Sequence, residues 1–185
     1  AGDGTFNVSG GGAVSNTYGY VGYESGGTGT VTVDGGTWTN SGYLTVGHEG
    51  DGILNVIGGG TVSSNGSTVG RYSGSTGTVT VEDGTWTSSG NLYVGYEGDG
   101  TLDVLGSGTV SSNGGTFGYW SGGTGTVTVD GGTWTNSDNL AVGVWGDGTL
   151  NVLGGGSVSN TEGYVGHASG GTGTVTVDGG TWTNS

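Results

Sequence analysis

The chain is built from short segments in which every second residue is apolar. Residues 27–49 contain three of them, at 30–33, 37–39 and 44–46, separated by clusters of Gly, Asn, Asp and Ser. Alternation with a period of two is typical of half-buried strands, and the intervening residues are turn formers. The pattern therefore predicts three short strands joined by tight turns, and no helical periodicity is visible.

The same pattern returns every 48 residues. The string TGTVTVDGGTWTNS begins at Thr28, Thr124 and Thr172, and a close variant begins at Thr76. Each unit divides into half-repeats of 25 and 23 residues that share the scheme G-x-G-T-Φ-x-V…Φ-x-V-G, where Φ is apolar. We expect one domain of eight half-repeats, the last of them incomplete. Its repeat units are residues 2–49, 50–97, 98–145 and 146–185.

Strands this short are too small to form a stable hairpin sheet alone. If each strand stacks on its copy about 4.8 Å along an axis, it gains ladder hydrogen bonds on both sides. We therefore expect an all-β fold, a parallel β-solenoid (β-helix) of about eight coils with three strands per coil. An antiparallel sandwich is the less favoured alternative. The usual crossover preference predicts a right-handed solenoid.

The inward positions of these strands predict a narrow core. Val31, Val33, Leu44 and Val46 point inward, and the central strand places Trp and Val alternately along the axis. Alternation of large and small side chains fills a thin interior without clashes. The predicted core stack is Trp38, Trp86, Trp134 and Trp182, with Val14, Val62, Val110 and Val158 between them.

Composition excludes several classes of protein. The 185 residues include 51 Gly but no Gly-X-Y triplets and no Pro, which excludes collagen. A formal net charge of −14, with Arg71 as the only Lys or Arg, argues against nucleic acid as a partner. No apolar run is long enough for a membrane span, and without Cys there is no disulfide framework.

The sequence offers little for catalysis. Two His, one Arg, and no Lys or Cys leave few acid–base or nucleophilic groups, and the regular repeat leaves no long insertion to gather them. We therefore expect a protein without enzymatic activity and without a cofactor. Calcium is a weak alternative, because one acidic position recurs only on every second coil, about 9.6 Å apart. Its members are Asp3, Asp51, Asp99 and Asp147.

Two ladders are predicted on the surface. Thr30 and Thr32 with their copies form outward T-x-T rungs, which makes ice binding a minor alternative, although half of the rungs carry other residues. The second ladder is aromatic: most of its residues follow the Φ-x-V-G glycine, and Tyr20, Tyr93 and Tyr164 lie two residues before it. Exposed rings in a row suit sugar faces or lateral packing. Stacking of like residues up the solenoid is the structural explanation for the same rings. The ladder comprises Tyr20, Tyr23, His48, Tyr72, Tyr93, Tyr96, Tyr119, Trp120, Trp145, Tyr164 and His167.

The strings GDGTLNVLGGG…VG and GTGTVTVDGGTWTNS…LYVG cover essentially the whole chain. This pattern resembles the glycine-rich repeat of bacterial type V secretion (autotransporter-like) passenger domains and PEP-CTERM-associated surface proteins. The resemblance implies an exported bacterial β-solenoid located outside the cell or at its surface, and it supplies no catalytic residues.

We therefore expect a structural protein, such as a surface stalk, an adhesin shaft or a filament subunit. No polar cap is visible at either end of the repeats, so we expect either a longer array or end-to-end self-association. The alternative function is a binding module that uses the aromatic ladder for glycans or another partner.

Overall fold

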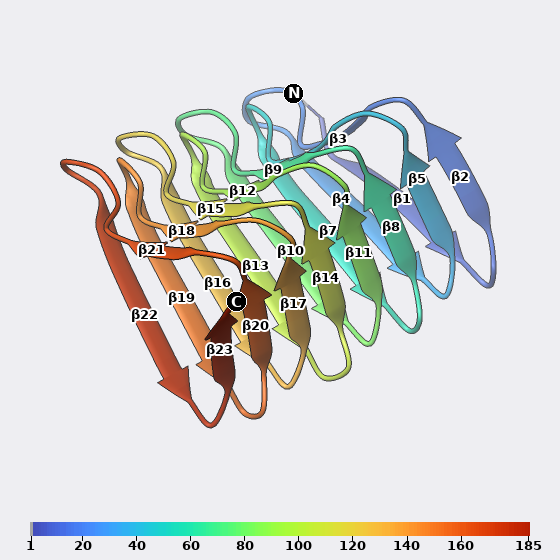
Figure 1. Ribbon diagram of the computed structural model, residues 1–185. Helices are drawn as coiled ribbons and strands as arrows, with labels where there is room; N and C mark the ends of the chain where they lie inside the picture. The colour runs from blue at the N-terminus through green and yellow to red at the C-terminus, as the bar shows by residue number, and fades with distance from the viewer. Residues whose placement is uncertain (1) are drawn as a thin grey trace.

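Each of the first seven coils contributes one strand to each of three parallel sheets, and the eighth contributes to two of them (Figure 1). The structure is a computed structural model that describes residues 2–185. Within these residues there are only strands, turns and bends. The coils follow one another along a single axis, so each strand lies beside its counterparts from the preceding and following coils. The predicted parallel β-solenoid of about eight coils with three strands per coil is confirmed, the last coil having two strands.

The three sheets are named A, B and C in the order in which a coil visits them. Sheet A contains β1 (Gly4–Ser9), β4 (Thr28–Asp34), β7 (Asp51–Ile57), β10 (Thr76–Glu82), β13 (Asp99–Leu105), β16 (Thr124–Asp130), β19 (Asp147–Leu153) and β22 (Thr172–Asp178). Sheet B contains β2 (Ala13–Asn16), β5 (Thr37–Asn40), β8 (Thr61–Ser64), β11 (Thr85–Ser88), β14 (Thr109–Ser112), β17 (Thr133–Asn136), β20 (Ser157–Asn160) and β23 (Thr181–Asn184). Sheet C contains β3 (Gly19–Val21), β6 (Leu44–Val46), β9 (Ser67–Val69), β12 (Leu92–Val94), β15 (Gly115–Phe117), β18 (Leu140–Val142) and β21 (Gly163–Val165).

Coil lengths alternate as the sequence predicts. In sheet A, Gly4 pairs with Gly29 and Gly29 pairs with Gly52, which are steps of 25 and 23 residues. The corner between sheets C and A takes up the difference, with residues 22–27 connecting the strands in the first coil and only 47–50 in the second. The longer connections form the alternate wide loops along one side of Figure 1. This C–A corner carries most of the aromatic ladder.

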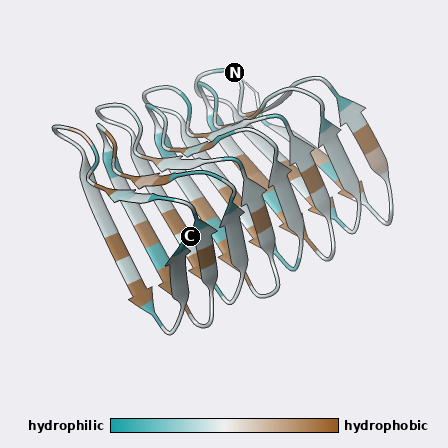
Figure 2. Ribbon diagram, viewed as in Figure 1, coloured by the Kyte–Doolittle hydropathy of each residue, from teal (hydrophilic) through white to brown (hydrophobic). Residues whose placement is uncertain are grey.

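The core is one apolar column enclosed by the three sheets. Figure 2 shows the apolar bands recurring at the same position in successive strands. Val33, Leu44 and Val46 are completely buried, and so are Trp86 and Trp134. Trp38 pairs in register with Val14 and Val62, which confirms the alternation of Trp and Val. Trp182 also faces the core but is only partly buried, because it lies in the last coil.

Each core tryptophan needs an acceptor for its indole N–H. The Trp134 Nε1 donates to Ser112 Oγ at 3.0 Å, and Trp38 Nε1 donates to Asn16 Oδ1 at 2.7 Å. The acceptor therefore belongs to the preceding coil and sits at the end of its sheet B strand. Trp86 is the exception, because its Nε1 is buried without a hydrogen-bond partner. The corresponding acceptor, Ser64, is instead hydrogen-bonded to Ser67.

Candidate binding surface

The outward face of sheet C has a tyrosine on every third coil. The single outward position of its short strands, the middle one, holds small residues in the coils between. Because strands stack about 4.8 Å apart, successive tyrosines are about 14 Å apart along the axis. The outward residues, in coil order, are Tyr20, Thr45, Thr68, Tyr93, Thr116, Ala141 and Tyr164.

The rings at the C–A corner contact one another in three groups rather than as one unbroken ladder. Tyr23 and His48 stack with ring centroids 4.7 Å apart. Trp120 and Trp145 stack at 5.0 Å. The first group is Tyr20, Tyr23, His48 and Tyr72; the second is Tyr93, Tyr96, Tyr119, Trp120 and Trp145; the third is Tyr164 and His167. All eleven predicted ladder residues therefore lie on one side of the solenoid, in these groups.

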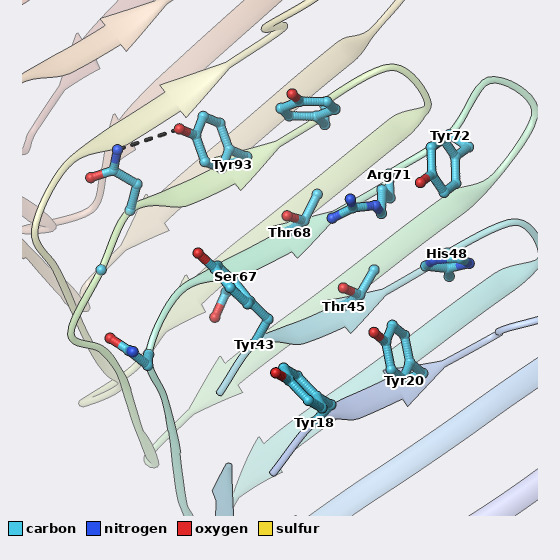
Figure 3. Close-up of a pocket in the computed structure, with 14 residues that line it drawn as sticks. Tyr18, Tyr20, Tyr43, Thr45, His48, Ser67, Thr68, Arg71, Tyr72 and Tyr93 are labelled. Atoms are coloured by element: carbon cyan, nitrogen blue, oxygen red, sulfur yellow. Dashed lines mark hydrogen bonds between the residues drawn. The ribbon is translucent and has the colours of Figure 1, made fainter. Parts of the chain in front are cut away.

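The first hollow lies over sheet C between Tyr20 and Tyr93 and has a volume of about 660 Å³. Thr45 and Thr68 line its floor and are 2% and 7% exposed, and Figure 3 shows Tyr43 and Arg71 beside them, between the two tyrosines. The floor lies low because the two coils between the tyrosines carry threonine at the outward position of sheet C.

A second hollow repeats this arrangement further along the axis. It has a volume of about 420 Å³, and its lining includes Thr116, Ala141 and Tyr164. Tyr119 and Trp145 also line it from the C–A corner. The two hollows are thus related by a translation of three coils, a period that differs from the two-coil period of the sequence.

Tyr18 and Tyr43 are functional candidates that the sequence pattern did not reveal. They lie at the corner between sheets B and C, line the first hollow and are 57% and 59% exposed. The ring of Tyr43 covers Gly66 of the next coil, where an added Cβ would lie 2.7 Å from the ring. Because both tyrosines fall in turns rather than on a strand face, the period-two pattern gave no signal for them.

The one Lys or Arg of the sequence, Arg71, lines the first hollow. Arg71 and His48 line it together with tyrosines and small polar residues, and none of the fifteen carboxylate side chains does. The Arg71 guanidinium carbon is 5.2 Å from the centroid of the Tyr72 ring, a cation–π contact. The Nε of Arg71 is buried and has no hydrogen-bond partner. Figure 3 shows the Arg71 side chain extending from the Tyr72 side toward Thr68.

Two tyrosines of the surface have raised pKa values. Burial raises the pKa of Tyr119, and the nearby Tyr93 and Tyr96 raise it further. The Tyr164 hydroxyl donates to the Glu162 carboxylate, which raises the pKa of Tyr164. Both phenols therefore stay protonated at neutral pH and remain hydrogen-bond donors.

The structure places the weak calcium candidates as separate, exposed side chains. Asp3 accepts a hydrogen bond from the Thr28 backbone N–H at 3.1 Å, which is a structural contact with the next coil. In residues 2–185, no group of three or more His, Cys, Asp or Glu side chains is placed to hold a metal ion. Asp51, Asp99 and Asp147 are likewise exposed. The arrangement gives no support to a calcium site.

The hydroxyl-bearing surface is more regular on sheet B than on sheet A. The predicted rungs of Thr30 and Thr32 do face outward on sheet A, but other residues interrupt both outward columns. Ile53 interrupts the first, and the second is interrupted by Asn7, Asn55, Asp103 and Asn151. On sheet B, every strand from β5 onward carries Thr or Ser at both outward positions, as in Thr37 and Thr39. The T-x-T pattern of sheet A gave no sign of this second face. Ice binding remains a prediction, and sheet B is its better candidate surface.

No protein-family model, curated protein or solved structure matches the chain. In residues 2–185, no helix has the length and apolarity required to cross a membrane.

Proposed function

We propose that this chain is a non-enzymatic structural rod of the bacterial exterior, such as a surface stalk or an adhesin shaft. The observation that carries the proposal is that all three sheets continue along the molecule without interruption. Sheets A and B each run through eight parallel strands and sheet C through seven, without an inserted domain. The longest connections, such as residues 22–27, have six residues. Such a molecule supplies length, stiffness and a repetitive surface.

The external location rests on the resemblance of the repeat to those of exported bacterial proteins. Antibodies raised against the purified chain test it on intact and permeabilised cells of the source bacterium. Labelling of intact cells supports the proposal, and labelling only after permeabilisation contradicts it.

Self-association end to end is part of the proposal. Phe6 in the first coil is 40% exposed, and Val165 and Val177 near the other end are each 48% exposed. Their inner-coil counterparts, such as Leu54 and Val69, are fully buried. A further coil would cover these apolar side chains, whether it came from more of the same chain or from a second copy.

Glycan binding is the second candidate function, and the two ring-lined hollows favour it. Aromatic rings present flat apolar faces with polar edges, which suit the apolar faces and hydroxyl groups of sugars. A variant with Tyr20 and Tyr93 both changed to Ala removes the walls of the first hollow. We expect this variant to lose binding on a glycan array, with Thr135→Ala on sheet B as the control. If the double variant binds glycans as well as the Thr135→Ala control does, glycan binding by this hollow is contradicted.

A further inference from the structure

We propose that the first hollow binds an extended oligosaccharide that carries a carboxylate, and that Arg71 pairs with this carboxylate. The inference rests on the glycan-binding candidate above and adds the chemical class of the sugar. It makes the hollow between Tyr20 and Tyr93 a site for uronic acids.

The charge distribution is the first argument. The chain has a formal net charge of −14, yet its only arginine lies in a hollow with no carboxylate in its lining. Side chains of Glu49 and Ser25 line a different hollow, beside the other side of Tyr72. Arg71 is therefore the one fixed charge among the residues that line the hollow, and a guanidinium there favours an anionic ligand group.

The hydrogen-bonding state of Arg71 is the second argument. A guanidinium is always charged and presents its donors in a planar fork that matches a carboxylate. The Nε of Arg71 is buried and unpartnered, and the contact with the Tyr72 ring satisfies none of its donors. The buried Nε is out of reach of a ligand, so a ligand carboxylate in the hollow would accept from the Nη groups of the same guanidinium, which are not among the buried atoms.

The walls of the hollow favour a sugar over a peptide that binds by strand addition. Strand addition requires an exposed edge strand. The strands beneath this hollow have no free edge, because β6 pairs with β3 and β9, and β9 pairs with β6 and β12. The ring-lined walls instead offer apolar faces, and Asn65 and Asn91 offer amides to ligand hydroxyl groups.

The second hollow provides an internal comparison. A translation by three coils carries Arg71 onto Val144, which is 95% buried and uncharged. The second hollow therefore repeats the tyrosine spacing without the fixed positive charge. We expect it to contact a neutral part of the ligand and to show no preference for a carboxylate.

Calorimetric titration tests the proposal with defined probes. Tetramers of galacturonic, glucuronic and mannuronic acid are each compared with the carboxyl-reduced neutral tetramer, and pentaglutamate serves as the peptide probe. We expect at least one acidic tetramer to bind about tenfold or more tightly than its neutral counterpart, the range expected of a hydrogen bond to a charged group. Arg71→Gln should remove this preference but retain binding of the neutral tetramer.

The controls separate this inference from the function on which it rests. Tyr93→Ala should weaken the acidic and neutral tetramers alike, and Thr135→Ala should change neither. Circular dichroism confirms that each variant is folded.

Equal affinity for acidic and neutral tetramers, or an unchanged preference in Arg71→Gln, would overturn the role of Arg71 while leaving glycan binding intact. If no tetramer binds, both proposals fail. Equally tight binding of pentaglutamate, or a dimer in sedimentation that Tyr93→Ala dissociates, would replace the sugar with a peptide or a second copy.

Discussion

Asp83 and Ser107 depart from the repeat together. Asp83 has a backbone φ of 54°, whereas the other even-numbered coils place Gly35, Gly131 and Gly179 at this left-handed position. The Asp83 carboxylate accepts hydrogen bonds from the backbone N–H and the hydroxyl of Ser107, at 2.9 and 2.8 Å. These bonds hold the pKa of Asp83 below its usual value. They compensate for a conformation that is unfavourable for most residues other than glycine and that Asp tolerates better than most.

Substitutions at Asp83 should therefore separate the hydrogen bonds from the backbone strain. Asp83→Ala keeps the strained φ and loses both bonds, so we expect it to lower the midpoint of urea unfolding. Asp83→Gly loses the same bonds but removes the strain, so its midpoint should stay close to that of the unmodified protein. Equal midpoints for the Ala and Gly variants would show that the backbone conformation carries no cost.

Ser67 and Ser88 form a second matched pair. Other odd-numbered coils have glycine at the position of Ser67, such as Gly19, where an added Cβ would lie 2.6 Å from Asn40 Oδ1. In the next coil, Ser88 replaces the bulkier asparagine of Asn40, and this leaves room for the Ser67 side chain. The smaller side chain at position 88 thus compensates for the larger one at position 67.

Ser88→Asn alone should lower the free energy of unfolding, because its amide would collide with Ser67. Adding Ser67→Gly removes the collision and frees the Ser64 hydroxyl to accept from Trp86. We expect a favourable coupling energy of about 1–3 kcal/mol between the two substitutions in a double-mutant cycle. Simple additivity would contradict the proposed exchange of volume.

Asp103 makes the stability of the fold depend on pH, and its contribution becomes less unfavourable as the pH falls. The corresponding residues in other odd-numbered coils are asparagines, Asn7, Asn55 and Asn151. Burial raises the pKa of Asp103, and a hydrogen bond with Thr128 only partly offsets the effect. The ionised carboxylate therefore costs stability above that raised pKa, and the cost disappears as the pH falls and the group is protonated.

Asp103→Asn should therefore raise the melting temperature at pH 7, and the gain should shrink as the pH is lowered below the pKa of Asp103. Thermal unfolding followed by circular dichroism at pH 7 and pH 3 measures both values. A gain that persists undiminished at pH 3 would show that charge is not its cause.

At the scale of the strand and sheet, the alternation of Trp and Val determines how the coils stack. Trp134 is fully buried, and its indole N–H is hydrogen-bonded, whereas Trp120 at the C–A corner is 42% exposed. Trp134→Ala should lower the free energy of unfolding by about 3–5 kcal/mol through the cavity it leaves. Trp120→Ala is the matched control and should have a much smaller effect. Similar losses in denaturant titrations would contradict the inward assignment of Trp134.

Strand positions were predictable because they depend on local alternation and on the 48-residue repeat. The segment predicted at 44–46 is β6, and that predicted at 30–33 lies within the longer β4. The hollows were not predictable, because their three-coil spacing arises only when residues 20, 93 and 164 stack in one sheet. Tyr43 was missed for a related reason, since a turn residue has no face assigned by periodicity.

For the whole molecule, the repeat itself can be tested by deletion. Removing residues 98–145 joins Glu97 to Gly146, which restores the local sequence Glu-Gly-Asp-Gly. Because the register of all three sheets is preserved, we expect a folded solenoid that is two coils, or about 10 Å, shorter. Small-angle scattering measures the length, and the first hollow should be unaffected. An unfolded product would contradict the modular stacking of the coils.

Electron microscopy of the purified chain tests the central claim, a structural rod that assembles end to end, most directly. One chain of eight coils is about 38 Å long at the strand spacing of a β-sheet. The account predicts unbranched fibres of constant width that lengthen with protein concentration, because a second copy covers the apolar side chains of the end coils. Discrete rods of about 38 Å at every concentration would contradict the filament and leave surface binding as the better account.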